Sequence, residues 1–247
     1  MIRALYSAAS GMTAQQLNVD NIANNLANAS TIGFKMHRAQ FQDLLYQTLV
    51  QPGAAASQQT VVPAGLQIGL GTRSVANETI FTQGNFSETD NPLDMVIQGS
   101  GFFQVQLPSG QIVTSTGYPL QPQITIPADA QVITIAQDGT VSYTVPNQTA
   151  SQQAGQIQLA NFQNPSGLNS LGGSLFTPTD ASGEPTVGLA GGQEGMGTIM
   201  QGYTEGSNVS VVEEFIALIV AQRGYEANSK VVQAADQMYQ QVNNLTR

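Results

Sequence analysis

The sequence contains no cysteine and no tryptophan, and its only histidine is His37. Without cysteine the chain can form no disulfide, no thiolate nucleophile and no zinc–thiolate centre. A single histidine also excludes a pair of histidine ligands for a metal. Any Ser-His-Asp triad would have to use His37, which has basic Lys35 and Arg38 close by in the sequence. We therefore interpret His37 as an ordinary exposed or interfacial residue, and we expect neither an enzyme nor a metal site.

Charged residues are scarce as well. Only 9% of the 247 residues are charged, and 16 acidic against 7 basic side chains give a net charge of −9. This balance argues against nucleic acid and anionic membranes as partners, because both select basic patches. The sequence has no run of 18 apolar residues, so we expect no helix that spans a membrane.

Two further patterns are absent. The first residues, MIRALYSAASGMTAQQ, lack the uninterrupted apolar core of a secretory signal peptide. If the protein leaves the cytoplasm, we expect it to use another export route. The glycines at residues 69–71 and 99–101 do not complete a nucleotide-binding motif. We interpret them as turns at strand ends and expect no cofactor.

Apolar residues recur every seven positions at both ends of the chain. The two series are Leu5, Met12, Val19 and Leu26, and Val211, Leu218, Tyr225, Val232 and Tyr239. This spacing favours a left-handed coiled coil. The capping-box spacing from Ser210 to Glu213 predicts that the C-terminal helix starts near Ser210, and it runs to about Leu245. The N-terminal helix is predicted to stop within residues 30–33, with Gly33 in a left-handed conformation.

Between the two ends, short β-type runs alternate with turn signals. Residues 48–73, which are poor in charge and rich in Gly, Ala and Gln, predict an extended arm containing short strands. Strands are expected in DMVIQ, GFFQVQL, QIVTS, QITI, QVITIA and TVSYTV, with turns at residues 108–110 and 137–139. This pattern is typical of a Greek-key or barrel-like β-domain. Residues 163–202, mostly Gly, Pro, Ser and Thr, are predicted to form long loops.

The combined pattern predicts an α+β fold. Long N- and C-terminal helices are expected to form a coiled-coil core domain from residues 1–35 and 207–247. Residues 36–73 would be an extended connecting arm, and residues 74–206 an inserted all-β outer domain with long loops. The alternative is two unrelated terminal helices packed on one globular core. Neither helix has the charged outer face of a solvated surface helix, which favours the coiled-coil core.

Amide side chains form an arc on each helix. Asn21, Asn24, Asn25 and Asn28 lie on one side of the N-terminal helix, and Gln233 and Gln237 begin a similar arc near the C-terminus. Amides both donate and accept hydrogen bonds without charge, although they form helices less readily than Glu, Lys or Arg. This favours an interface over a neutral solvent face. Because the helices have few local ion pairs, we expect them to be partly disordered in the monomer and to fold on assembly.

Two longer motifs resemble a known family. ANNLANASTIGFK, residues 23–35, is similar to the N-terminal signature of the axial proteins of the bacterial flagellum, which build its rod and hook. SNVSVVEEFIALIVAQRGYEANSK, residues 207–230, resembles the matching C-terminal signature. The stretches FQDLLYQTLVQPGA, PAGLQIGLGTR and FTQGNFSETDNPLDMVIQGSGFFQVQLP extend the resemblance over nearly the whole chain. Residues 46–73 favour the distal-rod branch of the family over the proximal-rod branch.

The resemblance implies a structural function. Copies of the chain would assemble helically into a hollow, rigid drive shaft that transmits torque from motor to hook and encloses an export channel. The implied partners are other copies, the proximal rod proteins, the hook protein, the ring proteins of the outer membrane and peptidoglycan, and the flagellar type III export apparatus. The implied location is the basal body from the periplasm to the outer membrane, reached without a cleavable signal peptide.

The residues expected at subunit interfaces come from the two heptad series and the amide arcs. They are Leu5, Met12, Val19, Asn21, Asn24, Asn25, Leu26, Asn28, Val211, Leu218, Tyr225, Asn228, Val232, Gln233, Gln237 and Tyr239. Each Asn could bond a neighbouring subunit or line the channel. The alternatives for the whole protein are a proximal-rod or hook-type axial protein and, from another class, an enzyme or carbohydrate-binding module. After Pro108 the chain also lacks a hairpin that the family usually has.

Overall fold

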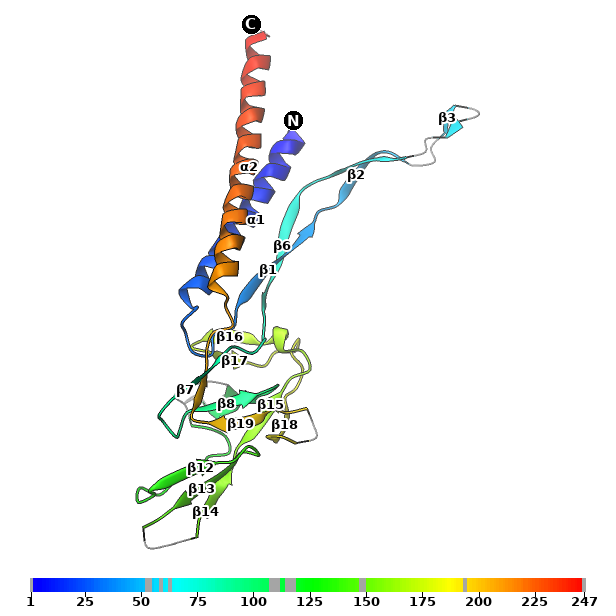
Figure 1. The fold of residues 1–247 in the computed structure, drawn as a ribbon. Coiled ribbons are helices and arrows are strands. Elements are labelled where there is room, and N and C mark those ends of the chain that lie inside the picture. The colour runs from blue at the N-terminus through cyan, green and yellow to red at the C-terminus, as the bar shows by residue number, and fades with distance from the viewer. Residues whose placement is uncertain are drawn as a thin grey trace. The chain divides into compact units, whose positions relative to one another are not determined.

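The computed structural model describes residues 2–51, 55–57, 60–61, 64–106, 112–113, 119–146, 150–192 and 195–245. A long helix lies near each end of the chain, and antiparallel strands make up the segments between them (Figure 1). Helix α1 spans Ile2–Ala27 and helix α2 spans Val211–Leu245. The α+β class is therefore confirmed. So is the start of the C-terminal helix directly after Ser210.

The chain divides into two units, each made of separate segments. The first unit contains Met1–Ala27, His37–Thr79 and Ser210–Arg247, and the second contains Asn28–Met36 and Ile80–Val209. We call them the helical unit and the β unit. The chain therefore passes from one unit to the other four times, after Ala27, Met36, Thr79 and Val209.

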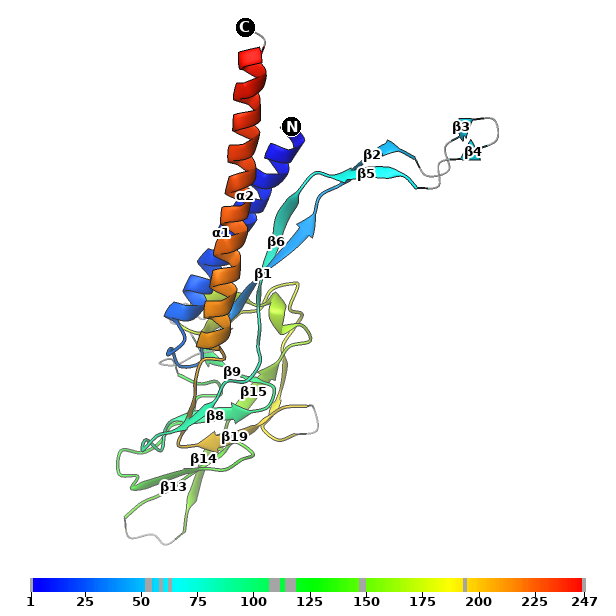
Figure 2. The ribbon, with the colours of Figure 1, turned by 45° about the horizontal axis from the view of Figure 1, so that its top comes forward.

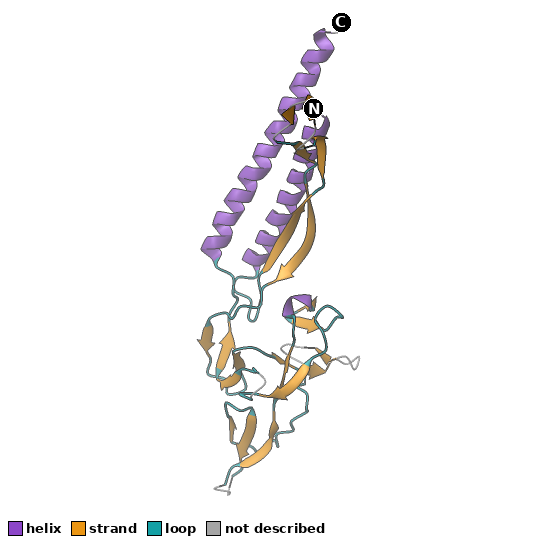
Figure 3. Cartoon of the chain, turned by 90° about the vertical axis from the view of Figure 1, so that its right-hand side faces the viewer, coloured by secondary structure: helices purple, strands orange, loops and turns teal. Residues whose placement is uncertain are grey.

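In the helical unit, α1 and α2 run antiparallel and side by side (Figure 3). The seam between them is lined by small residues, since Ala8, Ala221 and Ala235 are each at most 5% exposed. Gly11 faces Asn228, and a β-carbon at position 11 would lie 2.8 Å from Asn228 Nδ2. Small side chains thus allow the two helices to approach closely, with polar side chains filling the spaces that they leave.

A long hairpin completes the helical unit (Figure 2). Strand β1, His37–Asp43, pairs antiparallel with β6, Thr72–Thr79. Beyond this ladder, β2, Tyr46–Val50, pairs with β5, Leu66–Gly69, and β3, Ala55–Ser57, pairs with β4, Thr60–Val61. The amide of Thr72 donates to Ser10 Oγ at 3.3 Å, which attaches the hairpin to α1.

The β unit is built from short antiparallel ladders. Its strands are β7 Phe86–Glu88, β8 Met95–Gln98, β9 Phe102–Phe103, β10 Val105–Gln106, β11 Ile112–Val113, β12 Val132–Ile135, β13 Thr140–Thr144, β14 Gln152–Gln156, β15 Gln158–Asn161, β16 Asn169–Gly172, β17 Leu175–Thr177, β18 Thr186–Leu189, β19 Thr198–Gln201 and β20 Tyr203–Glu205. A single 3-10 turn, η1 Pro165–Gly167, is found among the described residues of this unit. The ladders are β12-β13-β14, β18-β15-β9, β16-β17, β19-β8, β20-β7 and β10-β11.

Two hydrophobic clusters hold the β unit together. The larger one is centred on Leu159 and Ile199, which are 0% and 1% exposed. The smaller one contains the buried rings of Phe162 and Phe176, with the partly buried rings of Phe81 and Phe102 packed against it. The Phe81 and Phe176 rings meet edge to face, with 5.1 Å between their centroids. Edge-to-face contact is the favoured geometry for aromatic pairs.

Several strand predictions are wrong. Residues 163–202 contain β16, β17, β18 and β19 rather than only loops, because pairs of apolar residues between glycine turns are enough for a short strand. The run QITI at residues 123–126 forms no strand. It lies between Pro122 and Pro127, which lack amide donors, although Ile124 and Ile126 still pack against the core. The described strands pair in twos and threes and close no barrel.

Two further expectations, the turn at residues 108–110 and the hairpin missing after Pro108, concern a stretch that lies largely outside the described residues. The turn at residues 137–139 is confirmed, with Gly139 at φ 82°.

Candidate functional site

In each unit, one network of side-chain hydrogen bonds connects the segments at which the chain enters and leaves that unit. In the β unit the network joins residues 31–36, 80–84 and 205–209, and we call it the Asn208 clamp. In the helical unit the network joins the end of α1, the start of β1 and the first turn of α2, and we call it the Asn25 joint. The side chains at the centre of both networks lie in the two signature motifs or within two residues of them.

The Asn208 side chain holds two other segments of the β unit. Its Oδ1 accepts the amide of Met36 at 2.7 Å, and its Nδ2 donates to Ile80 O at 2.8 Å. The same Nδ2 donates to Thr82 Oγ1 at 2.9 Å and lies 3.2 Å from Thr82 O. The Ile80 amide in turn donates to Met36 O at 2.9 Å. A single amide therefore uses both its acceptor and its donors to hold two backbone segments side by side.

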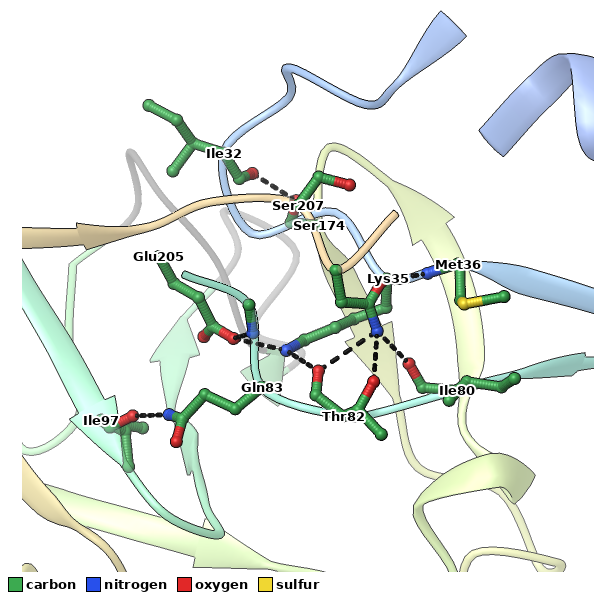
Figure 4. A network of polar contacts seen from close by, with 12 residues as sticks. Ile32, Lys35, Met36, Ile80, Thr82, Gln83, Ile97, Ser174, Glu205 and Ser207 are labelled. Atoms are coloured by element: carbon green, nitrogen blue, oxygen red, sulfur yellow. Dashed lines mark hydrogen bonds and ion pairs between the residues drawn. The ribbon is translucent and has the colours of Figure 1, made fainter. Parts of the chain in front are cut away.

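An ion pair completes the clamp (Figure 4). Lys35 Nζ lies 2.7 Å from Glu205 Oε1 and donates to Thr82 O at 2.9 Å, and the two charged side chains are 13% and 20% exposed. Glu205 Oε1 also accepts the Gly84 amide, and Glu205 O accepts the amide of Gly33, each at 2.8 Å. Gly33 has φ 67°, the predicted left-handed conformation. The predicted stop of the helix within residues 30–33 is wrong, because α1 ends at Ala27 and residues 28–33 form turns, in which the Thr31 amide donates to Asn28 O at 3.0 Å.

The Asn25 joint has a similar design. Asn25 is 2% exposed. Its Oδ1 accepts the His37 amide at 2.9 Å, and its Nδ2 donates to His37 O at 2.8 Å. The side chain thus pairs with both backbone groups of the first residue of β1, as a neighbouring strand would. Asn25 Nδ2 also donates to Glu214 Oε1 at 3.2 Å, which connects this pairing to α2.

Burial shifts the pKa of both titratable groups of the joint. It raises the pKa of the Glu214 carboxyl, which is 7% exposed, even though the hydrogen bond from Asn25 opposes the change. It lowers the pKa of His37, whose Nδ1 lies 3.0 Å from Thr79 Oγ1. In both groups, burial therefore stabilises the neutral form relative to the charged form. His37 is half-buried inside the helical unit rather than freely exposed.

The structure uses several of the α1 asparagines within the chain. Besides Asn25, Asn21 Oδ1 accepts Asn77 Nδ2 at 2.9 Å, and Asn28 Oδ1 accepts the Thr31 hydroxyl at 3.2 Å. Asn24 is exposed. The apolar members of the α1 set, Leu5, Met12, Val19 and Leu26, are all half-buried. Whether any of them meets a second subunit stays a prediction.

The predicted residues of α2 fall into two groups. Leu218, Asn228, Val232 and Tyr239 are half-buried, whereas Val211, Tyr225, Gln233 and Gln237 are exposed. The deepest positions of α2 lie on the line of Glu214, Ala221 and Ala235. The exposed members are the ones that this chain leaves available to a partner.

The sequence patterns place Asn25 among the expected interface residues but do not single out the other central residues of the two networks. They assign no role to Lys35, Glu205, Asn208 or Glu214. The available signal was their position, because Lys35, Asn208 and Glu214 lie inside the two signature motifs and Glu205 lies two residues before the second.

Within the described part of the chain, no group of three or more His, Asp or Glu side chains could hold a metal ion. No helix there has both the length and the apolar character needed to cross a membrane.

Comparisons with known proteins decide the family. The flagella basal body rod protein model matches residues 5–35, the C-terminal model of the flagellar basal body rod FlgEFG proteins matches residues 200–245, and the flagellar hook protein FlgE/F/G D1 domain model matches residues 108–143. The flagellar basal-body rod protein FlgG of Caulobacter vibrioides is 48% identical, over 99% of both chains. The chain belongs to the flagellar basal-body rod protein family.

Other rod-family members support the assignment. FlgG of Buchnera aphidicola from Acyrthosiphon pisum is 47% identical, over 99% of this chain and all of that protein, and FlgG of Bacillus subtilis is 36% identical over the full length of both. The expectation of a structural flagellar rod protein rather than an enzyme is therefore confirmed. The alignment with the Buchnera protein runs over 261 positions, more than the 247 residues of the chain.

Among solved structures, the Helicobacter pylori flagellar hook protein FlgE2 is 14% identical and covers 69% of this chain and 43% of its own, with a TM-score of 0.26. This likeness is too loose to bear on fold or function. The matched rod-family segments contain every central residue of the two networks, with Asn25 and Lys35 in the first and Glu205, Asn208 and Glu214 in the second.

Proposed function

We propose that this chain is a structural subunit of the flagellar distal rod. Many copies would assemble helically into a hollow, rigid shaft that transmits torque from motor to hook and encloses the export channel. The membership of the rod family supports this, as does the end-to-end match with FlgG relatives, which includes the segment around residues 46–73.

An exposed apolar stripe on α2 carries the proposal of self-assembly. Val212, Phe215, Ile216, Ile219 and Val220 repeat at intervals of three and four residues, so they share one face of the helix. Val212 is 69% exposed, Ile216 58% and Val220 65%, and none of the five side chains is charged. Covering each would contribute roughly 1 kcal/mol or more. We call this face the α2 stripe.

The domain roles follow from this proposal. With the domain bounds predicted from the sequence, residues 1–35 and 207–247, which include α1 and α2, would form a coiled-coil inner core, and residues 74–206 would form the outer domain. Residues 36–73 would act as an arm that bridges neighbouring subunits. Apolar side chains on the described part of the arm support this role, because Leu45 is 85% exposed and Tyr46 and Leu66 are each more than half exposed.

The proposed partners beyond other copies are those implied by the family resemblance. They are the proximal rod proteins, the hook protein, the ring proteins of the outer membrane and peptidoglycan, and the flagellar type III export apparatus. The proposed location is the basal body from the periplasm to the outer membrane. The terminal helices would order fully only on assembly, which would allow the chain to be exported in a loosely folded form.

The test is polymerisation of the full chain carrying Ile216→Asp. A carboxylate in the α2 stripe faces solvent in the single chain but would be buried unpaired in a subunit contact, which is costly. We expect a helix content equal to that of the wild type, and loss of polymers seen by electron microscopy and sedimentation. Gln222→Asp, at an exposed polar position of the same helix, is the matched control and should still polymerise.

Two outcomes would contradict the proposal. Normal polymers of the Ile216→Asp variant would show that the α2 stripe is not a subunit contact. A curved, supercoiled polymer of the wild-type chain would favour a hook-type axial protein, because a drive shaft that transmits torque through a fixed axis must be straight.

A further inference from the structure

The first turn of α2 contains a carboxyl group that the proposed rod function does not use. Glu214 is 7% exposed, and its Oε1 accepts a hydrogen bond from Asn25 Nδ2 at 3.2 Å. Its Oε2 is buried and has no hydrogen-bond partner among the residues that the structure describes. A buried polar atom without a partner costs free energy, and the cost is larger when the group is charged.

Glu214 is also a direct polar connection between α2 and the Asn25 joint. Asn25 lies near the end of α1 and pairs with both backbone groups of His37 at the start of β1. On the other side, the Glu214 amide donates to Ser210 O at 3.0 Å in the first turn of the helix. The state of this one carboxyl therefore affects how firmly the beginning of α2 is held against α1 and β1.

Two influences oppose each other at this carboxyl. The positive end of the α2 dipole and the Asn25 donor favour the ionised form. Burial disfavours it and is the largest effect, so the pKa of Glu214 lies above its ordinary value of 4.5, and the negative charge of Glu213 adds to the rise. Among the charged and titratable groups of the elements around it are Asp20 on α1, Glu213 on α2, His37 and Arg38 on β1, and Glu78 on β6. Arg38 and Glu78 pair with each other at 3.1 Å.

We propose that Glu214 is a proton-dependent latch, which holds the start of α2 on the Asn25 joint when it is protonated and loosens that attachment when it ionises. The protonated carboxyl still accepts the hydrogen bond from Asn25. It carries no charge, so the energetic cost of burying a carboxylate with one unpaired oxygen is removed. The latch is a property of the single chain and holds whether or not copies assemble. It goes beyond the rod function because it makes the order of the terminal helices depend on pH.

The direction of the effect follows from linkage. Because the pKa of Glu214 is raised in the folded chain, its stabilising contribution is fully present below pH 4.5 and is lost as the pH rises through the folded pKa. His37 acts in the opposite sense. Its pKa is lowered, so its contribution is present above its ordinary value of 6.5 and is lost as the pH falls through the folded pKa. Comparison with a variant that changes Glu214 alone separates the two effects.

The experiment measures hydrogen exchange at the His37 amide, which donates to Asn25 Oδ1, in the full chain between pH 4 and 8. Glu214→Gln keeps an acceptor for Asn25 but cannot ionise. We expect the ratio of opening constants, wild type over Glu214→Gln, to be flat below pH 4.5 and to increase above it by at most tenfold per pH unit, since one proton is involved. Glu226→Gln, an exposed carboxylate on the same helix, should follow the wild-type profile.

If the ratio of the opening constants, wild type over Glu214→Gln, stays constant from pH 4 to 8, the latch proposal is wrong. A second measurement covers the case in which Glu214→Gln does not fold, namely NMR titration of the Glu214 carboxyl carbon in the wild-type chain. A midpoint above 4.5 that coincides with a change in His37 amide protection supports the latch, and a midpoint at or below 4.5 overturns it.

Discussion

Asn208→Ala should open the β unit where its three crossing segments meet. The side chain accepts one hydrogen bond from Met36 and donates to Ile80 and Thr82, so the substitution removes about three bonds. At about 1 kcal/mol net for each, the cost is ~3 kcal/mol. The unpaired Met36 amide brings the cost to about 4 kcal/mol if water cannot reach it. A cost of ~3 kcal/mol corresponds to a roughly 100-fold increase in the opening of the clamp.

The assay is hydrogen exchange of the Met36 and Ile80 amides in the full chain, together with urea unfolding. We expect protection at both amides to fall by about 100-fold. Asn208→Asp keeps the acceptor for Met36 but places an oxygen against the carbonyls of Ile80 and Thr82, so it should cost at least as much. Asn85→Ala changes a nearby exposed asparagine and should cost less than about 0.5 kcal/mol. Protection in Asn208→Ala equal to that in Asn85→Ala would refute the reasoning.

The remaining substitutions test single contacts of the same clamp. Lys35→Met removes the cation of a mostly buried pair, and within the described part of the chain it leaves the Glu205 carboxylate with the Gly84 amide as its one donor. Urea unfolding should therefore show a loss of about 3 kcal/mol, and a loss below about 1 kcal/mol would mean that water screens the pair. Gly33→Ala adds a β-carbon that meets no backbone, with its closest contact at 3.7 Å from Ser174 Oγ, but forces a left-handed φ of 67° on alanine. It should cost about 1 kcal/mol, measured by thermal unfolding, and an unchanged midpoint would show that the turn relaxes.

The start of α2 and the left-handed Gly33 could be predicted because they depend on local chemistry, although α1 ends at Ala27, before the predicted stop within residues 30–33. The spacing from Ser210 to Glu213 marks the start of α2, and Gly33 is the first residue after α1 that can adopt a positive φ without strain. These features need no knowledge of the rest of the fold. The heptad series also identified both long helices, although the deepest seam positions of α2 lie on the neighbouring line of Ala221 and Ala235.

The two networks could not be predicted because their partners are far apart in sequence. Asn25 and Glu214 are separated by 189 positions, and Met36 and Asn208 by 172. A helical wheel places Asn25 on an amide face but contains no information on what that face meets. The strands within residues 163–202 were missed for another reason, since two or three apolar residues between glycines have no detectable period.

Asparagine suits positions 25 and 208 because its side chain can form hydrogen bonds with both the donors and the acceptors of the backbone. A chain that crosses between units leaves amides and carbonyls at the ends of its strands and helices, and each needs a partner if it is buried. A carboxylate could accept only, and an ammonium could donate only, whereas one amide does both. Asparagine in the last turns of α1 costs about 0.7 kcal/mol in helix propensity relative to alanine. Asn25 recovers more than that, because its two bonds to His37 contribute about 1 kcal/mol each. Asparagine is therefore favoured at position 25 even in a single chain, before any neighbour is added.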